Sequence, residues 1–272
     1  MNAEKRYGAL TAYVIGYLVF LYGPVLLLPL FSFNNSLYIT FPLKGFTFDW
    51  YRQMAGSDQL MESLQASLKV AVGVAVISTI LGVLAAKALT RYYLPGRGPV
   101  TGFLMLPLVV PSLVLALALL FIMRRVFDVE LSLYTVAAGH VMLCVPYSTL
   151  VMISRLEGFD KNLEEASFDL GESGWQTFWR ITFPLAWPGI VSSLLLCFSA
   201  SFDEYVVAAF LTGNETTMPV FIYSQLRFPQ RLPGVLALGS CILVGSVVMV
   251  TLSEWIRRRG VQPQRAGQGL AA

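Results

Sequence analysis

The chain has 272 residues, of which 56% are apolar and only 13% are Asp, Glu, Lys or Arg, with a net charge of +3. Soluble domains usually carry about a quarter charged residues, so this composition excludes an ordinary cytosolic enzyme, a disordered chain and a disulfide scaffold. The small, scattered positive charge does not indicate a nucleic-acid partner. The cysteines at 144, 197 and 241 lie in apolar stretches without CxxC spacing, which favours packing over a redox or metal role.

Six stretches contain no charged residue for 17 or more positions. A bilayer core of about 30 Å needs about 20 mostly apolar helical residues. We therefore predict an all-α integral membrane protein with six transmembrane helices. The expected spans are residues 11–33, 64–90, 100–123, 131–154, 186–211 and 233–255. Pro107 and Pro111 are expected to kink the third span, and Pro146 the fourth.

Six spans place both ends of the chain on one side of the membrane. That side carries twelve Lys and Arg residues and the other side seven, so we expect both termini to be cytoplasmic. Residues 1–10 would be a cytoplasmic N-terminus, 11–256 the transmembrane domain and 257–272 a basic cytoplasmic tail. The first apolar run is too long for a signal peptide and is treated as an uncleaved span.

The cytoplasmic segment 155–185, between the fourth and fifth spans, is too long for a simple connector. A first short helix is expected to begin at Asp160 or Asn162, with Asn162 and Glu165 at capping-box spacing. Gly171 would end this helix in a left-handed turn. Apolar residues recur at steps of three and four along it and give one apolar face: Phe159, Leu163, Ala166 and Leu170.

A second helix is expected to begin at Ser173, with Gln176 as capping-box partner, and to close at Pro184 and Pro188. It would carry an aromatic face formed by Trp175, Phe178 and Trp179. Such a helix pair could dock another protein or rest on lipid head groups. Acidic residues are disfavoured at an anionic membrane surface, and the first helix carries several, so docking is favoured: Glu164, Glu165 and Asp169.

Asp203 and Glu204 are adjacent carboxylates inside the fifth predicted span, about 25 Å along the helix from its cytoplasmic end. Ionisable groups at such depth usually face the bundle interior or a water-filled cavity. With Phe202 and Tyr205 beside them they could form a cation pathway. A structural ion pair is the equally weighted alternative. Because neighbouring helical positions differ by 100°, we expect one carboxylate to face the pathway and the other to pair with a base, for example Lys69, Arg227 or Arg231.

The strings Glu165-Ala166-Ser167, Gly171 and Ile181-Thr182-Phe183-Pro184 resemble the EAA signature of ABC importer permeases, which reads E-A-A, three residues, G, nine residues, I-x-L-P. Every fixed offset matches, although Ser167 replaces the second Ala and Phe183 replaces Leu. The order of the spans resembles a type I importer permease. Segments 155–171 and 201–213 look most like the spermidine/putrescine permease group.

This resemblance implies that the EAA helix is a coupling helix, which sits in a groove of a separate ATP-binding subunit and transmits its movement to the bundle. Glu165 would be the charged contact, Ala166 the small packing residue and Gly171 the turn, with further docking residues at Leu163, Ser167 and Asp169. It also implies a bacterial inner-membrane location and several partners. These are two ATP-binding subunits that hold ATP and Mg, a related but non-identical second permease, a periplasmic or lipid-anchored solute-binding protein, and membrane lipid.

The expected function is import of a polyamine by a permease that is not itself an enzyme and binds no cofactor. Another small solute, such as an opine or amino-acid derivative, is one alternative, and a self-sufficient secondary transporter is a second. A GxSG string at 171–174 fits an intramembrane protease poorly, because Ser173 lies in a charged segment and the lone histidine, His140, lies in mid-span. We expect His140 to be a packed, hydrogen-bonded residue. The outer loops 34–62 and 212–234 would face the binding protein.

Overall fold

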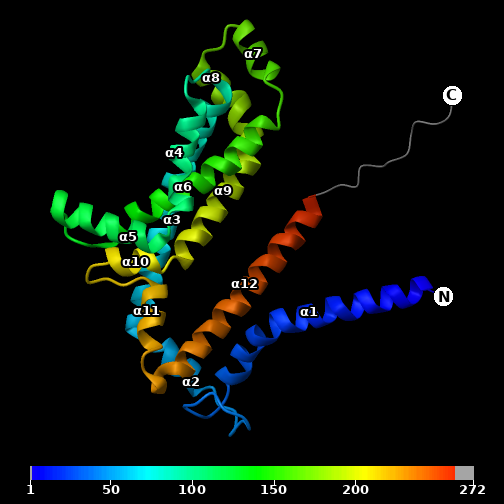
Figure 1. Ribbon diagram of the computed structural model, residues 1–272, viewed down its shortest axis with the longest axis vertical. Helices are drawn as coiled ribbons and strands as arrows, with labels where there is room; N and C mark the ends of the chain where they lie inside the picture. The colour runs from blue at the N-terminus through cyan, green and yellow to red at the C-terminus, as the bar shows by residue number, and fades with distance from the viewer. Residues whose placement is uncertain (1, 261–272) are drawn as a thin grey trace. The chain divides into compact units, whose positions relative to one another are not determined.

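The structure is a computed structural model in which residues 2–260 are described, so most of the predicted basic tail at 257–272 lies outside the described residues. The chain divides into two compact units, one formed by residues 58–224 and the other by residues 1–57 together with 225–272. The described chain consists of helices joined by loops and turns (Figure 1). An isolated bridge joins Asn34 and Phe46 in the second of these units.

The unit of residues 58–224 is built on three long helices that pack along one another, α3 (Asp58–Arg91), α6 (Leu133–Glu157) and α9 (Phe183–Asp203). The remaining elements of this unit are shorter: α4 (Arg97–Val109), α5 (Ser112–Phe121), the π-helical turn η1 (Ile122–Val126), α7 (Asn162–Asp169), α8 (Gly174–Thr177), the π-helical turn η2 (Phe178–Thr182), α10 (Val206–Leu211) and α11 (Met218–Gln225), whose last residue belongs to the other unit.

The other unit contains α1 (Asn2–Ser32), α2 (Asp49–Ala55), a 3-10 turn η3 (Pro229–Arg231) and α12 (Leu232–Gly260). Within it, α12 packs against both α1 and α2. The connection after α1 is held by polar contacts to α2: the indole of Trp50 donates to the carbonyl of Asn34 at 2.9 Å, and the hydroxyls of Ser32 and Tyr51 lie 2.6 Å apart.

The predicted membrane spans largely coincide with the helices of the structure. Four helices in the described chain are long and apolar enough to cross a bilayer, and a fifth span arises if the bent pair α4–α5 counts as one. The sixth expected span coincides with α12, part of which lies beyond the described side chains. The fifth span differs from the expectation, because its continuous helix runs from Gly174 to Asp203 rather than over 186–211.

The third span is broken rather than kinked. α4 ends at Val109, α5 begins at Ser112, and the two are bent by 100°. Pro111 has no N–H to donate to the preceding turn and disfavours a helical conformation at Val110, which is extended. Pro107 and Pro146, in contrast, lie inside continuous helices. Broken helices occur in membranes where they line protein or a water-filled cavity.

Small and polar residues join the three long helices of the 58–224 unit. The hydroxyl of Ser193 on α9 donates to Ser148 on α6 at 2.6 Å and lies 3.1 Å from the hydroxyl of Thr79 on α3. Gly82 on α3 sits directly against Ser148, and a Cβ there would overlap it. Close approach at small residues with interhelical hydrogen bonds is the usual packing of membrane helices, where burial of apolar surface adds little.

The core of this unit contains two of the three cysteines. Cys144 and Cys197 are buried, and each thiol lies against the backbone carbonyl of the other residue, at 3.7 and 3.5 Å. Cys241, on α12, is exposed instead of packed. Around the buried pair lies a cluster of aliphatic side chains from α3, α5, α6 and α10, which includes Val74, Leu115, Val136 and Leu211.

Candidate functional site

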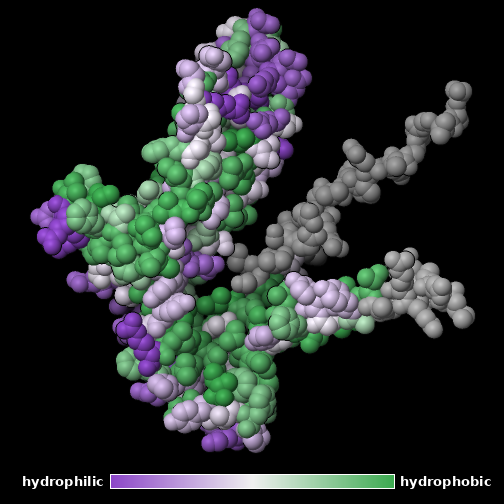
Figure 2. Space-filling view, viewed as in Figure 1, coloured by the Kyte–Doolittle hydropathy of each residue, from purple (hydrophilic) through white to green (hydrophobic). Residues whose placement is uncertain are grey.

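Two features of the 58–224 unit bear on function, and the first is the segment that contains α7 and α8. It lies at one end of the long helices, where hydrophilic residues gather, whereas the flanks of those helices are hydrophobic (Figure 2). The expected turn at Gly171 is confirmed, because this residue has a φ of +86°. The expected capping box of Asn162 and Glu165 is wrong: Lys161 precedes the helix and no side chain caps it. Asp160 instead accepts the N–H of Asn162 at 3.0 Å, in a local turn.

The second helix begins as expected, with a capping box between Ser173 and Gln176. It does not close at the prolines. It continues through the π-helical turn η2 into α9, where Pro184 occupies the first turn and Pro188 lies inside. Proline is tolerated in a first helical turn because its missing N–H has no partner to lose there. The coupling segment is therefore joined to the fifth span by continuous helix.

α7 presents an outward face that contains most of the expected docking residues. Exposed side chains on it are Leu163, Glu165, Ala166 and Asp169, and Leu170, which follows the helix, is 86% exposed. An apolar face that lies open to solvent, with acidic residues beside it, suits contact with another protein. Three residues of the expected apolar stripe, Leu163, Ala166 and Leu170, thus point away from the bundle, whereas Phe159 packs against its core.

Ser167 departs from the expected docking set. It is buried, and its hydroxyl lies 2.9 Å from that of Thr177 on α8. This contact closes α7 on α8 across the turn at Gly171, whose N–H donates to the carbonyl of Phe168 at 2.9 Å. Ser167 therefore holds the shape of the segment from inside.

The inner face of α7 is anchored by Glu164, which in the sequence is only one of several acidic residues on this short helix. One carboxylate oxygen of Glu164 lies 3.1 Å from Nε of Arg91, at the end of α3, with side-chain exposures of 10% and 5%. The other accepts a hydrogen bond from the hydroxyl of Thr182. Arg91 also donates to the carbonyl of Leu156 at 2.9 Å and stacks over the ring of Phe159 at 4.6 Å.

This network joins three parts of the unit. Arg91 belongs to α3, Leu156 to α6, and Thr182 to the helix that continues into α9. α7 is therefore tied to all three long helices through the contacts of Glu164 and Arg91. Sequence spacing could not show the pair, because Arg91 and Glu164 are far apart in the chain. The available signals were a charge at the end of a span and two consecutive glutamates on one short helix.

Aromatic rings continue from α8 along the start of α9. Trp175 contacts both Phe178 and Trp179, as the i, i+3, i+4 spacing predicts, and Phe183 extends the row. Lys87 of α3 lies over the ring of Phe178 at 4.7 Å, a cation–π contact. Trp175 and Trp179 are exposed, and aromatic side chains of this kind concentrate at the water interfaces of membrane proteins.

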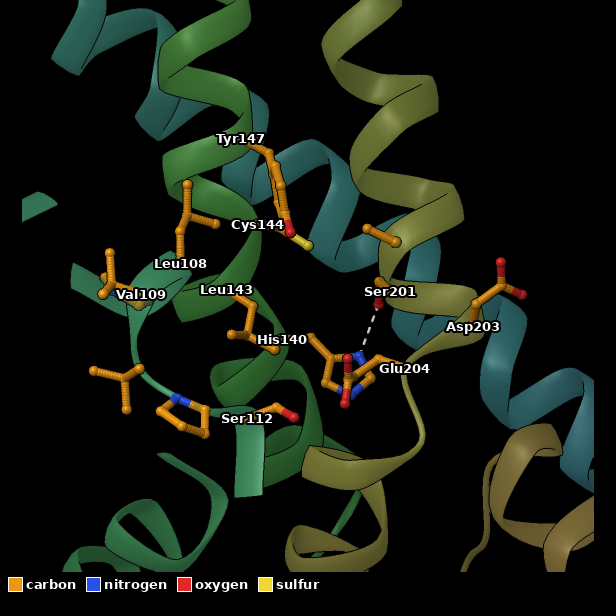
Figure 3. A pocket seen from close by; sticks show the side chains of 14 residues that line it. Leu108, Val109, Ser112, His140, Leu143, Cys144, Tyr147, Ser201, Asp203 and Glu204 are labelled. Atoms are coloured by element: carbon orange, nitrogen blue, oxygen red, sulfur yellow. Dashed lines mark hydrogen bonds between the residues drawn. The ribbon is translucent and has the colours of Figure 1, made fainter. Parts of the chain in front are cut away.

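The second feature is a cavity of about 500 Å³ inside the 58–224 unit (Figure 3). Its walls come from the α4–α5 break, from one face of α6 and from the end of α9. Polar groups that line it are Ser112, His140, Tyr147, Ser201, Asp203 and Glu204. Among the described residues, those that line this cavity include no Lys or Arg. The cavity is therefore suited to a cation.

The two carboxylates lie at the end of a helix rather than within one. α9 ends at Asp203, and Glu204 follows in an extended conformation. Oε1 of Glu204 accepts the N–H groups of Val206 at 2.9 Å and Val207 at 3.1 Å, at the start of α10. Glu204 thus satisfies part of its charge with a helix N-terminus rather than with the expected base. Lys69 lines a different cavity, beside Glu62 and Glu215.

The aromatic neighbours of the carboxylates do not line this cavity. The ring of Phe202 stacks on Phe198 with centroids 5.8 Å apart. That of Tyr205 stacks on Tyr223 at 3.9 Å. The aromatic ring that lines the cavity is Tyr147 of α6.

His140 is packed and hydrogen-bonded, as expected, and it also lines the cavity. Its Nδ1 lies 2.9 Å from the hydroxyl of Ser201 on α9 (Figure 3). The residue is only 1% exposed, yet its Nε2 has no hydrogen-bond partner among the described residues. A buried polar atom without a partner is costly and rare, which distinguishes this atom from an ordinary packing group.

The fold defines a polytopic helical membrane protein with a polar helical segment between its fourth and fifth spans. Residues 78–261 match the family described as the binding-protein-dependent transport system inner membrane component. This match covers more than half of the chain. The chain therefore belongs to that family.

Relatives and solved structures agree with this assignment. The spermidine/putrescine transport system permease protein PotC of Haemophilus influenzae is 34% identical over 256 residues, which cover 94% of this chain and 98% of that protein. The putrescine transport system permease protein PotI of Escherichia coli is 33% identical over 253 residues, covering 90% and 89%. A chain in the crystal structure of a bacterial ABC transporter that imports alginate superposes with a TM-score of 0.74 at 17% identity, over 96% of this chain and 99% of that one.

Proposed function

We propose that this chain is the permease subunit of an ATP-driven importer that carries polyamines such as spermidine or putrescine across a bacterial inner membrane. Two observations together support this proposal. The chain is 33–34% identical to polyamine permeases, and the charged residues that line its cavity are carboxylates. A polyamine is a flexible chain with several protonated amines. Carboxylates and helix C-termini attract such cations, and a Lys or Arg in the wall would repel them.

In this proposal, the end that bears α7 and α8 faces the cytoplasm, and both termini lie on the same side. The Lys and Arg residues near this end, such as Lys87, Arg91, Arg97 and Arg180, support that orientation through the positive-inside rule. The outward face of α7 then meets an ATP-binding subunit. Glu165 is the charged contact, Ala166 the close-packed one, and Leu163 and Asp169 flank them.

The permease completes its pathway with partners. A second, related permease supplies the other half of the bundle, two ATP-binding subunits hold ATP and Mg, and a solute-binding protein delivers the polyamine to the outer surface. Asp203 and Glu204 lie on the pathway, with Asp203 the less constrained of the two because Glu204 caps α10. Closure of the ATP-binding subunits must favour one permease conformation by several kcal/mol to shift its population strongly.

Reconstitution tests the proposal directly. The chain would be co-expressed with its ATP-binding subunit, second permease and binding protein, placed in proteoliposomes, and supplied with labelled putrescine or spermidine. Uptake that requires hydrolysable ATP and saturates with polyamine is the expected result. Uptake driven by an ion gradient without the ATP-binding subunit would show a secondary transporter instead. ATP-driven uptake of an amino-acid derivative but not of a polyamine would overturn the substrate.

A further inference from the structure

The cavity of the 58–224 unit is lined by a histidine with one ring nitrogen that has no hydrogen-bond partner among the described residues. His140 comes from the middle of α6 and is buried, and its Nδ1 is occupied by Ser201. Its Nε2 is left without a partner among the described residues, while the ring lines the cavity beside Glu204 (Figure 3). A buried polar atom without a hydrogen-bond partner costs about 1–3 kcal/mol. A polar group in the cavity would remove that cost.

The other groups at the cavity indicate which kind of solute group would pair with Nε2 of His140. Two helices end at the cavity, α4 at Val109 and α9 at Asp203, and helix C-termini carry partial negative charge. The last carbonyls of α4 lose their helical donors at the break, because Pro111 has no N–H. One opposing helix N-terminus, that of α10, is neutralised by Oε1 of Glu204. The N-terminus of α5, at Ser112, is the other helix N-terminus at the cavity.

Among the described residues, the walls of the cavity therefore present acceptors and carboxylates but no Lys or Arg. An ammonium group has three N–H donors and no acceptor, so it needs such a set. A carboxylate supplies charge, and a neutral imidazole nitrogen supplies a directional acceptor between the α6 and α9 walls. Such a nitrogen accepts only if the ring proton is on Nδ1, where it donates to Ser201. The hydrogen bond between His140 and Ser201 selects this tautomer once the ammonium is bound.

We propose that Nε2 of His140 accepts a hydrogen bond from a protonated amine of the transported solute, held in the cavity that Asp203 and Glu204 also line. His140 is then a specificity-determining residue of the pathway rather than a packing residue. This inference rests on the proposed function, since it needs a solute that carries an ammonium group. It adds a neutral acceptor on α6 to the carboxylates on α9.

The test uses the complete importer in proteoliposomes and two variants at one position. His140→Gln keeps a side-chain acceptor of similar reach, whereas His140→Phe keeps a planar ring and removes the acceptor. The maximal rate of ATP-dependent putrescine uptake should fall about ten-fold or more in His140→Phe, the loss typical of one hydrogen bond to a charged group. His140→Gln should keep most of the wild-type rate. Met142→Ala, on the exposed face of α6 and outside the cavity lining, is the control and should keep the wild-type rate.

ATP hydrolysis stimulated by the loaded binding protein separates a pathway role from a structural one. We expect it to persist in both His140 variants, because the defect lies in passage of the solute and not in coupling. Wild-type rates in His140→Phe, or equal losses of uptake in both variants, would overturn the acceptor role. Loss of ATP hydrolysis together with uptake would also overturn it, since that marks a packing defect. Failure of the wild-type importer to carry any polyamine would instead overturn the proposed function.

Discussion

The buried ion pair between Glu164 and Arg91 offers the sharpest test of how the coupling segment is held. Replacing Glu164 with Gln keeps the size of the side chain and an oxygen for the hydroxyl of Thr182. It removes the negative charge 3.1 Å from Nε of Arg91. Arg91 would then be left buried, with the carbonyl of Leu156 and the ring of Phe159 as its remaining partners.

The expected magnitude follows from burial. Breaking a buried ion pair by removing one partner costs about 3–5 kcal/mol, because the remaining charge is uncompensated. Exposed pairs contribute about 0–1 kcal/mol. The chain contains a matched exposed pair at the same end of the unit: Arg97 and Glu157 are also 3.1 Å apart, but their side chains are 51% and 55% exposed. Glu157→Gln is therefore the control for charge, residue type and location.

Hydrogen exchange of the α7 amides and ATP-dependent uptake would be measured in the assembled importer. A local loss of 3 kcal/mol corresponds to a change of about a hundred-fold in an equilibrium constant. Glu164→Gln should therefore expose the α7 amides about a hundred-fold more often, and uptake should fall while ATP hydrolysis becomes poorly coupled to it. Glu157→Gln should leave both readings near wild type. Equal behaviour of the two variants would refute the claim that burial of Glu164 anchors α7.

The remaining predictions concern packing, docking and the pathway. Gly82→Ala should destabilise the detergent-solubilised chain by about 1–3 kcal/mol in thermal unfolding, because the added Cβ meets α6. Gly73→Ala on the same helix, with nothing within 4 Å, should not, and equal effects would contradict this packing. Glu165→Lys should abolish uptake, while membrane fractionation should still find the variant inserted in the membrane. Normal uptake in this variant would contradict the docking role of Glu165. Asp203→Asn should lower the maximal rate of polyamine uptake more than Glu204→Gln does. Glu204→Gln should chiefly weaken the cap of α10, by about 1 kcal/mol. A larger loss of uptake in Glu204→Gln would show that Glu204 is the pathway carboxylate instead.

The sequence was informative wherever a local pattern has one physical meaning. Uncharged runs long enough for a bilayer predicted the positions of the long helices. A glycine that ends a short helix predicted the left-handed turn at Gly171, and serine–glutamine spacing predicted the cap at Ser173. Proline predicted a disturbance of the third span, although it could not distinguish a kink from the 100° break that the structure shows at Pro111.

Features that depend on contacts between distant segments could not be predicted in this way. Glu164 and Glu165 are neighbours of the same type, and which of them is buried depends on where Arg91 lies in the folded unit. Likewise, the cap that Glu204 provides depends on α9 ending at Asp203, whereas hydropathy alone extends the span past both carboxylates. The unpartnered nitrogen of His140 is visible only when α6 and α9 are placed together.

Contact between α7 and an ATP-binding subunit is the central claim, and site-directed cross-linking measures it most directly. In an assembly without Cys241, the exposed native thiol, a cysteine at Ala166 should form a cross-link to the ATP-binding subunit. A cysteine at Gln59, at the opposite end of α3 from Arg91, should form none. Cross-linking from position 59 but not from position 166 would show that the ATP-binding subunit binds the other end of the permease, and would contradict the account.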